Sequence, residues 1–346
     1  MFFNWTDSIN IDELNITKKL IMDGEIIVFP TETVYGIGAN ALNENAVKKI
    51  FEAKGRPSDN PLIIHLAEKD DIKKVAQNIT EIEQKLIDNF MPGPFTIILK
   101  KKSNISDIVS GGLDTIGIRI PNNKIAYNII KSCNVPIAAP SANISGKPSG
   151  TTFEDIKEEL ENKVSLIING GKTQIGLEST VVKVIDDVPI ILRPGAVTDL
   201  DIIKVIGKCK IGKNVFNRLL NNTKVESPGM KYKHYAPETK CKLINISDDL
   251  KQIETINKIT NDYKGDVVIL GFEEHKNKII ISKDRFISLG SKSNLENIAS
   301  IIYSSLRKAD RINSRLIIIE GVERKGFGIA IMNRLIRTCE YDVVEG

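Results

Sequence analysis

The segment 51–65, FEAKGRPSDNPLIIH, places two cations beside two prolines, and such a stiffened basic loop is suited to holding an anion. Lys54 lies at the end of an expected helix, and Arg56 precedes Pro57, which biases the Arg56 backbone toward extended conformations. The alternative is that both cations only complement the negative end of that helix. His65 ends the apolar run that follows, and there it is either a ligand or a satisfied core histidine.

A second basic side chain is expected on a strand, in LDTIGIRIP (113–121). Strand alternation puts Thr115, Gly117 and Arg119 on one face and the intervening isoleucines on the other. Thr115 and Arg119 are then about 13 Å apart, enough to serve two ends of a ligand. The planar fork of an arginine suits a carboxylate or phosphate, although a surface ion pair is the alternative.

Hydroxyl-rich segments follow or interrupt other expected strands. FPTETVYGIG (29–38) offers hydroxyls and a carboxylate, APSANISGKPSG (139–150) is rich in serine and glycine, and GLEST (176–180) and RPG (193–195) add to them. Each segment alone also fits a turn or a linker. Because ligand sites in open α/β sheets gather at strand ends, their recurrence predicts one pocket for an anionic, oxygen-rich ligand such as a nucleotide.

Two glycine-containing segments imitate nucleotide motifs without their context. GIGANA (36–41) fits G-x-G-x-x-A, but PTETVY stands between it and the preceding strand, where a dinucleotide turn would begin directly. NGGKT (169–173) resembles the tail of a P-loop, but Leu166 stands where the first glycine belongs and no helix is expected after Thr173. We therefore expect neither motif.

Strand-like and helix-like stretches must position these segments, and they alternate along the chain. The spacing of apolar residues predicts a helix over 43–54 that ends at Gly55. Short apolar runs predict strands at 25–29, 61–66, 95–100, 115–120, 135–139, 165–169 and 179–184. These stretches predict one large α/β domain over residues 1–212.

The chain then changes character. Residues 213–237 include NNTKVESPGMKYKHYAP, which has two prolines, a glycine and no periodicity, and we interpret this part as a linker or lid. A second pattern predicts strands at 266–272, 285–290 and 315–321 and helices near 294–309 and 328–339. This pattern indicates a small doubly wound domain over 238–346.

Composition excludes several classes of protein. The 346 residues carry a formal charge of only +4 and 5% aromatic residues, which does not favour a nucleic-acid-stacking surface. The four cysteines are isolated and predict buried apolar side chains rather than a zinc site or disulfides. No side-chain metal site is evident. The N-terminus lacks a secretory pattern and no apolar run reaches membrane length, so we expect a cytoplasmic protein.

Taken together and in this order, FPTETVYGIG, KGRPSDNPLIIH, GIRIP, APSANISGKPSG and RPG resemble the L-threonylcarbamoyladenylate synthase family with its YrdC-like domain. SPGMKYKHYAP (227–237) and the second domain resemble its long, two-domain form. The resemblance implies a YrdC-like twisted mixed-sheet domain followed by a Rossmann-like one. It also implies an enzyme that condenses L-threonine, bicarbonate and ATP to threonylcarbamoyl-AMP and pyrophosphate, for transfer by a partner complex to an adenosine of tRNA.

Residue by residue, the resemblance implies two sets of contacts. The L-threonine site would be lined by Thr33, His65, Arg119, Ala139 and Ser179. ATP would be held by Arg56, Asn60, Thr115, Ser141, Ser149 and Arg193, with charge from Lys54 and with Tyr235 folding back over the nucleotide. Any Mg²⁺ would arrive with ATP. No general base is evident, and the order in which bicarbonate reacts stays open.

Two other functions remain open on the residues. The basic linker and the cations around 48–56 also fit a module that binds tRNA or double-stranded RNA without chemistry of its own. A carbamoyl-transfer enzyme is a further alternative, because carbamoyl-adenylate chemistry occurs on related domains. Threonine-dependent release of pyrophosphate from ATP distinguishes the synthase from both.

Overall fold

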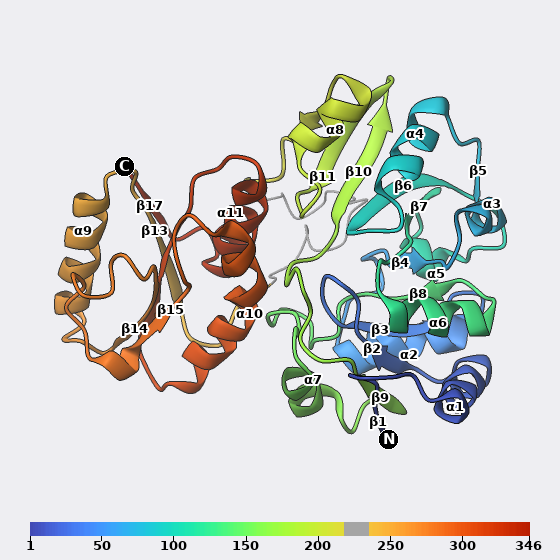
Figure 1. Ribbon diagram of the computed structural model, residues 1–346, viewed down its shortest axis with the longest axis horizontal. Helices are drawn as coiled ribbons and strands as arrows, with labels where there is room; N and C mark the ends of the chain where they lie inside the picture. Colours follow the sequence, from blue (N-terminus) through green and yellow to red (C-terminus); the bar gives the residue numbers. More distant parts are fainter. Residues whose placement is uncertain (218–234) are drawn as a thin grey trace. The chain divides into compact units, whose positions relative to one another are not determined.

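The computed structural model describes residues 1–217 and 235–346, and the chain divides into two compact units (Figure 1). Among the described residues, 1–145 and 149–217 form the N-terminal unit, whereas 146–148 and 235–346 form the C-terminal unit. The boundary expected at residue 212 and the linker expected over 213–237 stay predictions, because 218–234 lie outside the described residues.

The N-terminal unit is built on one mixed sheet. Its strands run in the order β1-β9-β2-β3-β8-β4-β7-β6-β10-β11-β12, and β5 pairs with β6 beside this path. The sheet contains both parallel pairs, such as β4 with β7, and antiparallel pairs, such as β6 with β7. The strands are β1 (Phe2–Asn4), β2 (Ile27–Phe29), β3 (Gly36–Asn40), β4 (Ile63–His65), β5 (Ala76–Gln77), β6 (Phe95–Lys101), β7 (Thr115–Arg119), β8 (Ile137–Ala138), β9 (Leu166–Asn169), β10 (Thr180–Ile185), β11 (Val188–Arg193) and β12 (Lys210–Ile211).

Most helices of this unit begin at side chains that cap their free amides, and α3 and α5 do not. Asn10 and Asn43, for example, accept hydrogen bonds from the first turns of α1 and α2. The helix α2 ends at Gly55, whose φ of 58° is the left-handed conformation that favours glycine. The helices are α1 (Ile11–Met22), α2 (Glu44–Lys54), α3 (Ile72–Val75), α4 (Glu81–Phe90), α5 (Asp107–Ser110), α6 (Lys124–Cys133), α7 (Phe153–Leu160) and α8 (Asp199–Ile206), with a 3₁₀ turn at Lys69–Asp71.

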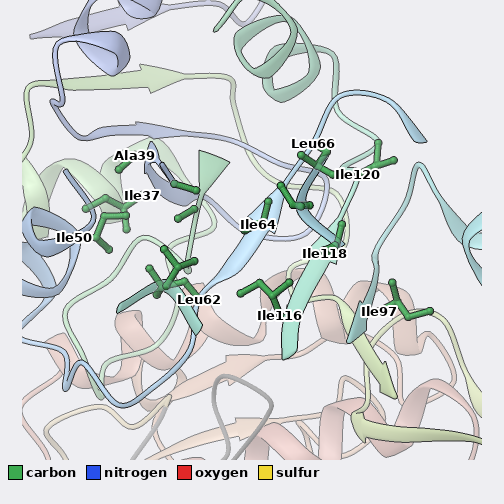
Figure 2. Packing of buried hydrophobic residues seen from close by; sticks show 14 of the residues in the cluster. Ile37, Ala39, Ile50, Leu62, Ile64, Leu66, Ile97, Ile116, Ile118 and Ile120 are labelled. Carbon is green, nitrogen blue, oxygen red and sulfur yellow. The ribbon is translucent and has the colours of Figure 1, made fainter. Parts of the chain in front are cut away.

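The alternation expected in β7 is confirmed by what its residues pack against. Figure 2 shows Ile116 and Ile118 beside Ile64 and Ile97, and these side chains belong to one buried cluster on one face of the sheet. Gly117 faces the other way, where an added Cβ would lie 3.3 Å from both Ile63 and Thr96. The core is therefore on one face of β4 and β7, and the opposite face is left for His65 and Arg119.

The imitation nucleotide motifs have structural explanations. Residues 36–40 form strand β3 itself, and Gly38 is needed there because a Cβ would lie 2.6 Å from the ring of Phe29. The residues after Thr173 form no helix. Neither segment has the strand–turn–helix arrangement of its motif, as the sequence predicts.

The C-terminal unit is a five-stranded parallel sheet with the order β15-β14-β16-β13-β17. The helix α9 lies on one face, and α10 and α11 lie on the other (Figure 1). The strands are β13 (Cys241–Asn245), β14 (Val267–Gly271), β15 (Phe286–Ser288), β16 (Leu316–Glu320) and β17 (Val343–Glu345). The helices are α9 (Asp249–Asp262), α10 (Leu295–Arg311) and α11 (Phe327–Thr338), with a 3₁₀ turn at Lys283–Arg285.

The fold class predicted from the sequence is confirmed: a large mixed-sheet unit is followed by a smaller doubly wound one. The sequence analysis did not single out β13, α9 or β17. β17 is an edge strand of three partly exposed residues, so its apolar signal is short. No helix in the described part of the chain is long and apolar enough to cross a membrane.

Candidate active site

Two parallel strands bring the first pair of predicted threonine ligands together. In the register of β4 and β7, His65 pairs with Arg119, and Leu66 N donates to Arg119 O at 3.0 Å. Ala139 follows the antiparallel neighbour β8, and its N–H donates to Ile63 O at 3.0 Å. Because Ala139 has no polar side-chain atom, only its backbone can contact a ligand through polar groups. Adjacent strand ends thus place these three residues side by side.

The turn between β2 and β3 adds a hydroxyl pair and a carboxylate. Thr31 Oγ1 and Thr33 Oγ1 lie 2.9 Å apart, and Thr31 Oγ1 also donates to Val34 O at 2.7 Å. Between them, Glu32 lies with Oε1 2.8 Å from Arg119 Nη2, and both side chains are about 95% buried. Glu32 Oε1 and Arg119 Nη2 are in contact but are not oriented to form a hydrogen bond. Neither atom has a hydrogen-bond partner among the described residues. This contact ties the turn to the end of β7.

Ser179 lies directly before β10, on the other side of Arg119. Its hydroxyl is 2.7 Å from Thr96 Oγ1, and the β6–β7 register puts Thr96 level with Arg119. Arg193 donates to Ser179 O from Nε at 3.1 Å and from Nη2 at 3.0 Å, and to Ser179 Oγ at 3.1 Å. Arg193 is buried, so a fixed cation stands behind the serine. The structure therefore sets His65, Arg119 and Ala139 at adjacent strand ends, with Thr33 next to the glutamate that contacts Arg119 and Ser179 hydrogen-bonded to Thr96 on the neighbouring strand.

His65 is neutral in this environment. Burial, and then the positive charge of Arg119, lower its pKa to about 3. Its Nδ1 lies 3.2 Å from Ile63 O, and because a carbonyl oxygen only accepts, Nδ1 carries the proton. His65 Nε2 is then a hydrogen-bond acceptor, suited to a hydroxyl or another donor.

Lys54 clamps the serine-rich loop through its ammonium group. This group donates to Ser141 O, to Asn143 O at 2.6 Å and to Asn143 Oδ1 at 3.4 Å. Desolvation, and then the charge of Arg56, hold the pKa of Lys54 well below its ordinary value. Lys54 therefore shapes the loop through hydrogen bonds in addition to any charge that it contributes to the site.

The basic loop after α2 folds around its own arginine. Arg56 Nη2 donates to Pro61 O at 3.1 Å and to Asn60 O at 3.4 Å, so the guanidinium is fixed across the loop that the prolines stiffen. Asn60 is buried. Thr115, at the start of β7, is half-buried, and its Oγ1 has no hydrogen-bond partner in the described ranges. Gly117, two residues after Thr115, pairs with Ile63 in the parallel register of β4 and β7. Thr115 therefore lies level with the end of this loop, two residues before Ile63.

The remaining serines are oriented by side chains that the sequence analysis did not assign to the site. Ser141 Oγ donates to Asn143 Oδ1 and Ser149 Oγ donates to Glu178 Oε1, both at 2.6 Å. Asn143 and Glu178 lie inside the motifs APSANISG and GLEST, and both are buried. A polar side chain within a hydroxyl-rich motif is therefore the signal that would have identified them.

Tyr235 lies in the C-terminal unit. Its ring stacks on Tyr303 at 5.4 Å between centroids, and its carbonyl accepts a hydrogen bond from Thr338 Oγ1 at 3.0 Å. Its assignment to the nucleotide stays a prediction of the sequence. Most of the linker that precedes it lies outside the described residues.

The arrangement has the properties of an electrostatic site. Arg119 and Arg193 are buried cations at strand ends, and hydroxyls and a neutral imidazole surround them. Residues 1–217 and 235–346 contain no group of three histidines, cysteines or carboxylates that could hold a metal ion. Such fixed cations stabilise negative charge that develops on a phosphate or carboxylate during a reaction.

Known proteins share both units. Residues 19–195 match the family described as "Telomere recombination" (Sua5, YciO, YrdC), and residues 197–339 match "Threonylcarbamoyl-AMP synthase, C-terminal domain". The threonylcarbamoyl-AMP synthase of Pyrococcus abyssi is 41% identical over 338 residues, 96% of each chain. That of Bacillus subtilis is 40% identical over 98% of this chain and 96% of its own. The crystal structure of P. abyssi Sua5 complexed with L-threonine superposes with a TM-score of 0.93 at 40% identity, covering 100% of this chain and 99% of the other.

The fold and the matches together define an enzyme of the AMP-transferring class. The chain belongs to the threonylcarbamoyl-AMP synthase family, in its two-domain form. The family and the activity that the sequence motifs predict are confirmed. The assignment of individual residues to threonine or ATP is not tested by these matches and belongs to the proposal below.

Proposed function

We propose that this protein joins L-threonine, bicarbonate and ATP in one pocket of the N-terminal unit, with the threonine contacts and, apart from Tyr235, the ATP contacts predicted from the sequence. The observation that carries the proposal is Arg119, buried at the end of β7 with unused donors at Nε and Nη2 and flanked by neutral His65. A guanidinium held in this way suits the carboxylate of an amino acid. Thr33, Ser179 and the backbone of Ala139 complete a small polar site around it.

The ATP side of the proposal rests on the stiffened loops. Arg56, fixed across its loop, and Arg193, fixed behind Ser179, are cations whose positions do not depend on a ligand. As the carbamate attacks the α-phosphorus and pyrophosphate leaves, negative charge builds on the phosphates, and fixed cations and amides lower the energy of that state. Asn60, Thr115, Ser141 and Ser149 supply the neutral polar contacts.

Mg²⁺ enters the proposal as part of the second substrate. Two carboxylates that contact the serine-rich loop are already engaged, because Glu178 accepts a hydrogen bond from Ser149 and Glu159 accepts one from Ile144 N. No metal-binding cluster occurs in the described ranges. Mg²⁺ bound to the phosphates of ATP needs few protein ligands. We therefore expect it to arrive with ATP, where it would neutralise phosphate charge.

The product also implies partners. A mixed anhydride of a carbamate and AMP is a reactive acyl donor, so a transferase complex that moves the threonylcarbamoyl group to tRNA must consume it. Direct contact with tRNA and a cytoplasmic location are part of the proposal, in keeping with the family and with the basic segment 221–240.

The test is pyrophosphate release with single substrates left out. We expect release to require threonine, bicarbonate and ATP together, and Arg56→Ala to lower turnover at least ~10²-fold, the scale for loss of one electrostatic stabiliser. Arg285→Ala is the matched control, because Arg285 pairs with Asp266 in the C-terminal unit. Near wild-type turnover of Arg56→Ala would refute the site assignment. Salt-sensitive RNA binding without pyrophosphate release would favour the RNA-binding alternative.

A further inference from the structure

Glu32 and Arg119 form a buried charge pair that leaves most of its hydrogen-bonding capacity unused. Glu32 Oε1 lies 2.8 Å from Arg119 Nη2, and the exposed fractions of the two side chains are 4% and 5%. In the described part of the chain, neither carboxylate oxygen of Glu32 has a hydrogen-bond partner, and neither do Arg119 Nε and Nη2. Buried polar groups are nearly always satisfied, so each exception needs an explanation.

Stability of the fold does not explain the pair. Burying two charges is unfavourable unless good geometry and additional hydrogen bonds compensate for the lost hydration, and here the contact lacks hydrogen-bond geometry. Elsewhere in the same unit, buried Arg193 donates three hydrogen bonds to Ser179. The unused atoms of Glu32 and Arg119 are those of a site that is completed by a ligand.

The ligand that complements adjacent carboxylate and guanidinium groups is an amino acid in its zwitterionic form. Its carboxylate suits the free donors of Arg119, and its ammonium suits the free oxygens of Glu32. This step rests on the proposed function, in which Arg119 binds the threonine carboxylate.

We propose that Glu32 binds the ammonium group of threonine and accepts the proton that this nitrogen must lose before it can react. Glu32 is well placed for such a role because its own backbone is held. Ile175 N donates to Glu32 O at 2.9 Å, and the next amide, Gly176 N, donates to Thr33 O at 3.0 Å. The carboxylate is thus presented from a turn that two consecutive hydrogen bonds hold in place.

The proton balance of the reaction calls for this acceptor. Zwitterionic threonine and bicarbonate give the threonine carbamate, water and one proton, and the carbamate oxygen then displaces pyrophosphate from the α-phosphorus of ATP. Forming the C–N bond needs a lone pair on nitrogen, so one N–H bond breaks first, and Glu32 takes that proton and later releases it to solvent. A second N–H proton leaves in the water made from the bicarbonate hydroxyl.

The other polar groups described near Arg119 are not suited to take this proton. His65 has its pKa lowered to about 3 by burial and by Arg119, so its imidazole holds a proton weakly. Thr31, Thr33 and Ser179 offer hydroxyls, which are not bases at neutral pH. Glu32 is a carboxylate in contact with Arg119. When threonine binds, its ammonium group would replace part of this contact at Glu32, and Arg119 would contact the threonine carboxylate instead.

The experiment compares Glu32→Gln with Glu25→Gln, the same chemical change at a partly exposed residue that pairs with Lys49. Calorimetry measures binding of L-threonine and of 3-hydroxybutanoate, which keeps the carboxylate, hydroxyl and methyl groups and lacks the ammonium. We expect wild type and Glu25→Gln to prefer threonine by ~10-fold or more, the scale of a hydrogen bond to a charged group. Glu32→Gln should bind both ligands within about threefold.

Turnover provides the second readout. Glu32→Gln should lower kcat by ~10²-fold or more, the usual contribution of a positioned acid or base. Glu32→Asp, which keeps a carboxylate, should retain more activity than Glu32→Gln. It also serves as the folded variant if Gln at this position impairs folding.

The groups that face Glu32 are the Arg119 guanidinium from β7 and, beside it, the neutral imidazole of His65 from β4.

The outcomes separate this inference from the function on which it rests. If wild type shows no threonine-dependent pyrophosphate release, the function itself fails. If wild type is active and Glu32→Gln keeps either its kcat or its preference for threonine over 3-hydroxybutanoate, the role of Glu32 is wrong and the function stands. Equal kcat values for Glu32→Asp and Glu32→Gln would also overturn proton transfer to this residue.

Discussion

Replacing Arg119 by methionine should destabilise the N-terminal unit and abolish turnover for two separable reasons. The substitution Arg119→Met would leave the carboxylate of Glu32 buried without its cation. At the 2.8 Å separation of Glu32 Oε1 and Arg119 Nη2, the attraction is about 6 kcal/mol for an effective dielectric constant of about 20. Removing one partner of a buried pair usually costs about 3–5 kcal/mol, and we expect Arg119→Met to lower the free energy of unfolding by that amount.

The double variant Glu32→Gln/Arg119→Met removes both charges and distinguishes charge burial from packing. Because an unpaired buried charge then no longer exists, the double variant should recover most of the lost stability. Turnover should not recover, since the groups proposed to hold the threonine carboxylate and ammonium are both absent. The expected pattern is therefore restored folding with turnover still at least ~10²-fold below wild type.

The assay uses the single tryptophan of the chain. Trp5 is buried in the N-terminal unit, and its Nε1 donates to Glu13 Oε2 at 2.5 Å, so its fluorescence reports the unfolding of this unit. A local probe is needed because a chain of two units need not unfold in one step. Urea titrations of wild type, both single variants and the double variant give the coupling energy between the two residues.

A urea midpoint for Arg119→Met equal to that of wild type would refute the reasoning, because it would mean that Glu32 is not a desolvated carboxylate. A double variant less stable than Arg119→Met would also refute it. In that case the two side chains contribute packing rather than compensating charge.

Two further predictions concern stability. His65 has a pKa of about 3 in the fold and about 6.5 unfolded, so the unfolded chain binds the extra proton, and stability falls as pH decreases through 6.5. Between pH 7 and 5 we expect a loss of about 2 kcal/mol, which His65→Asn should remove from the Trp5-monitored urea titration. Gly38→Ala should cost about 1–3 kcal/mol in the same assay, because its Cβ would lie 2.6 Å from Phe29 Cε1. Gly55→Ala is the control, because a Cβ at Gly55 would meet no atom within 4 Å and only the φ of 58° opposes the change. If Gly55→Ala lowered the free energy of unfolding as much as Gly38→Ala, the packing explanation for Gly38 would be contradicted.

Much of the fold could be predicted because its local signals agree. The expected strand over 115–120 and the helix over 43–54 are found as Thr115–Arg119 and Glu44–Lys54, since period-two alternation, the helical spacing of apolar residues and a terminal glycine each act over a few residues. The three-residue edge strand Val343–Glu345 could not be found in this way. Its pairing with β13 supplies the order that its own residues do not.

The sequence by itself determined the chemistry available to this protein: basic loops stiffened by proline, an arginine on a strand, serine-rich turns, and a family resemblance that the matches confirm. Only the tertiary structure decided which groups meet. The parallel register sets His65 beside Arg119, and the turn after β2 brings Glu32 to within 2.8 Å of the same guanidinium from 87 positions away in the chain. Composition and spacing cannot encode such a contact, because it depends on strand order and on burial, which place an ordinary glutamate in a buried pair with an arginine.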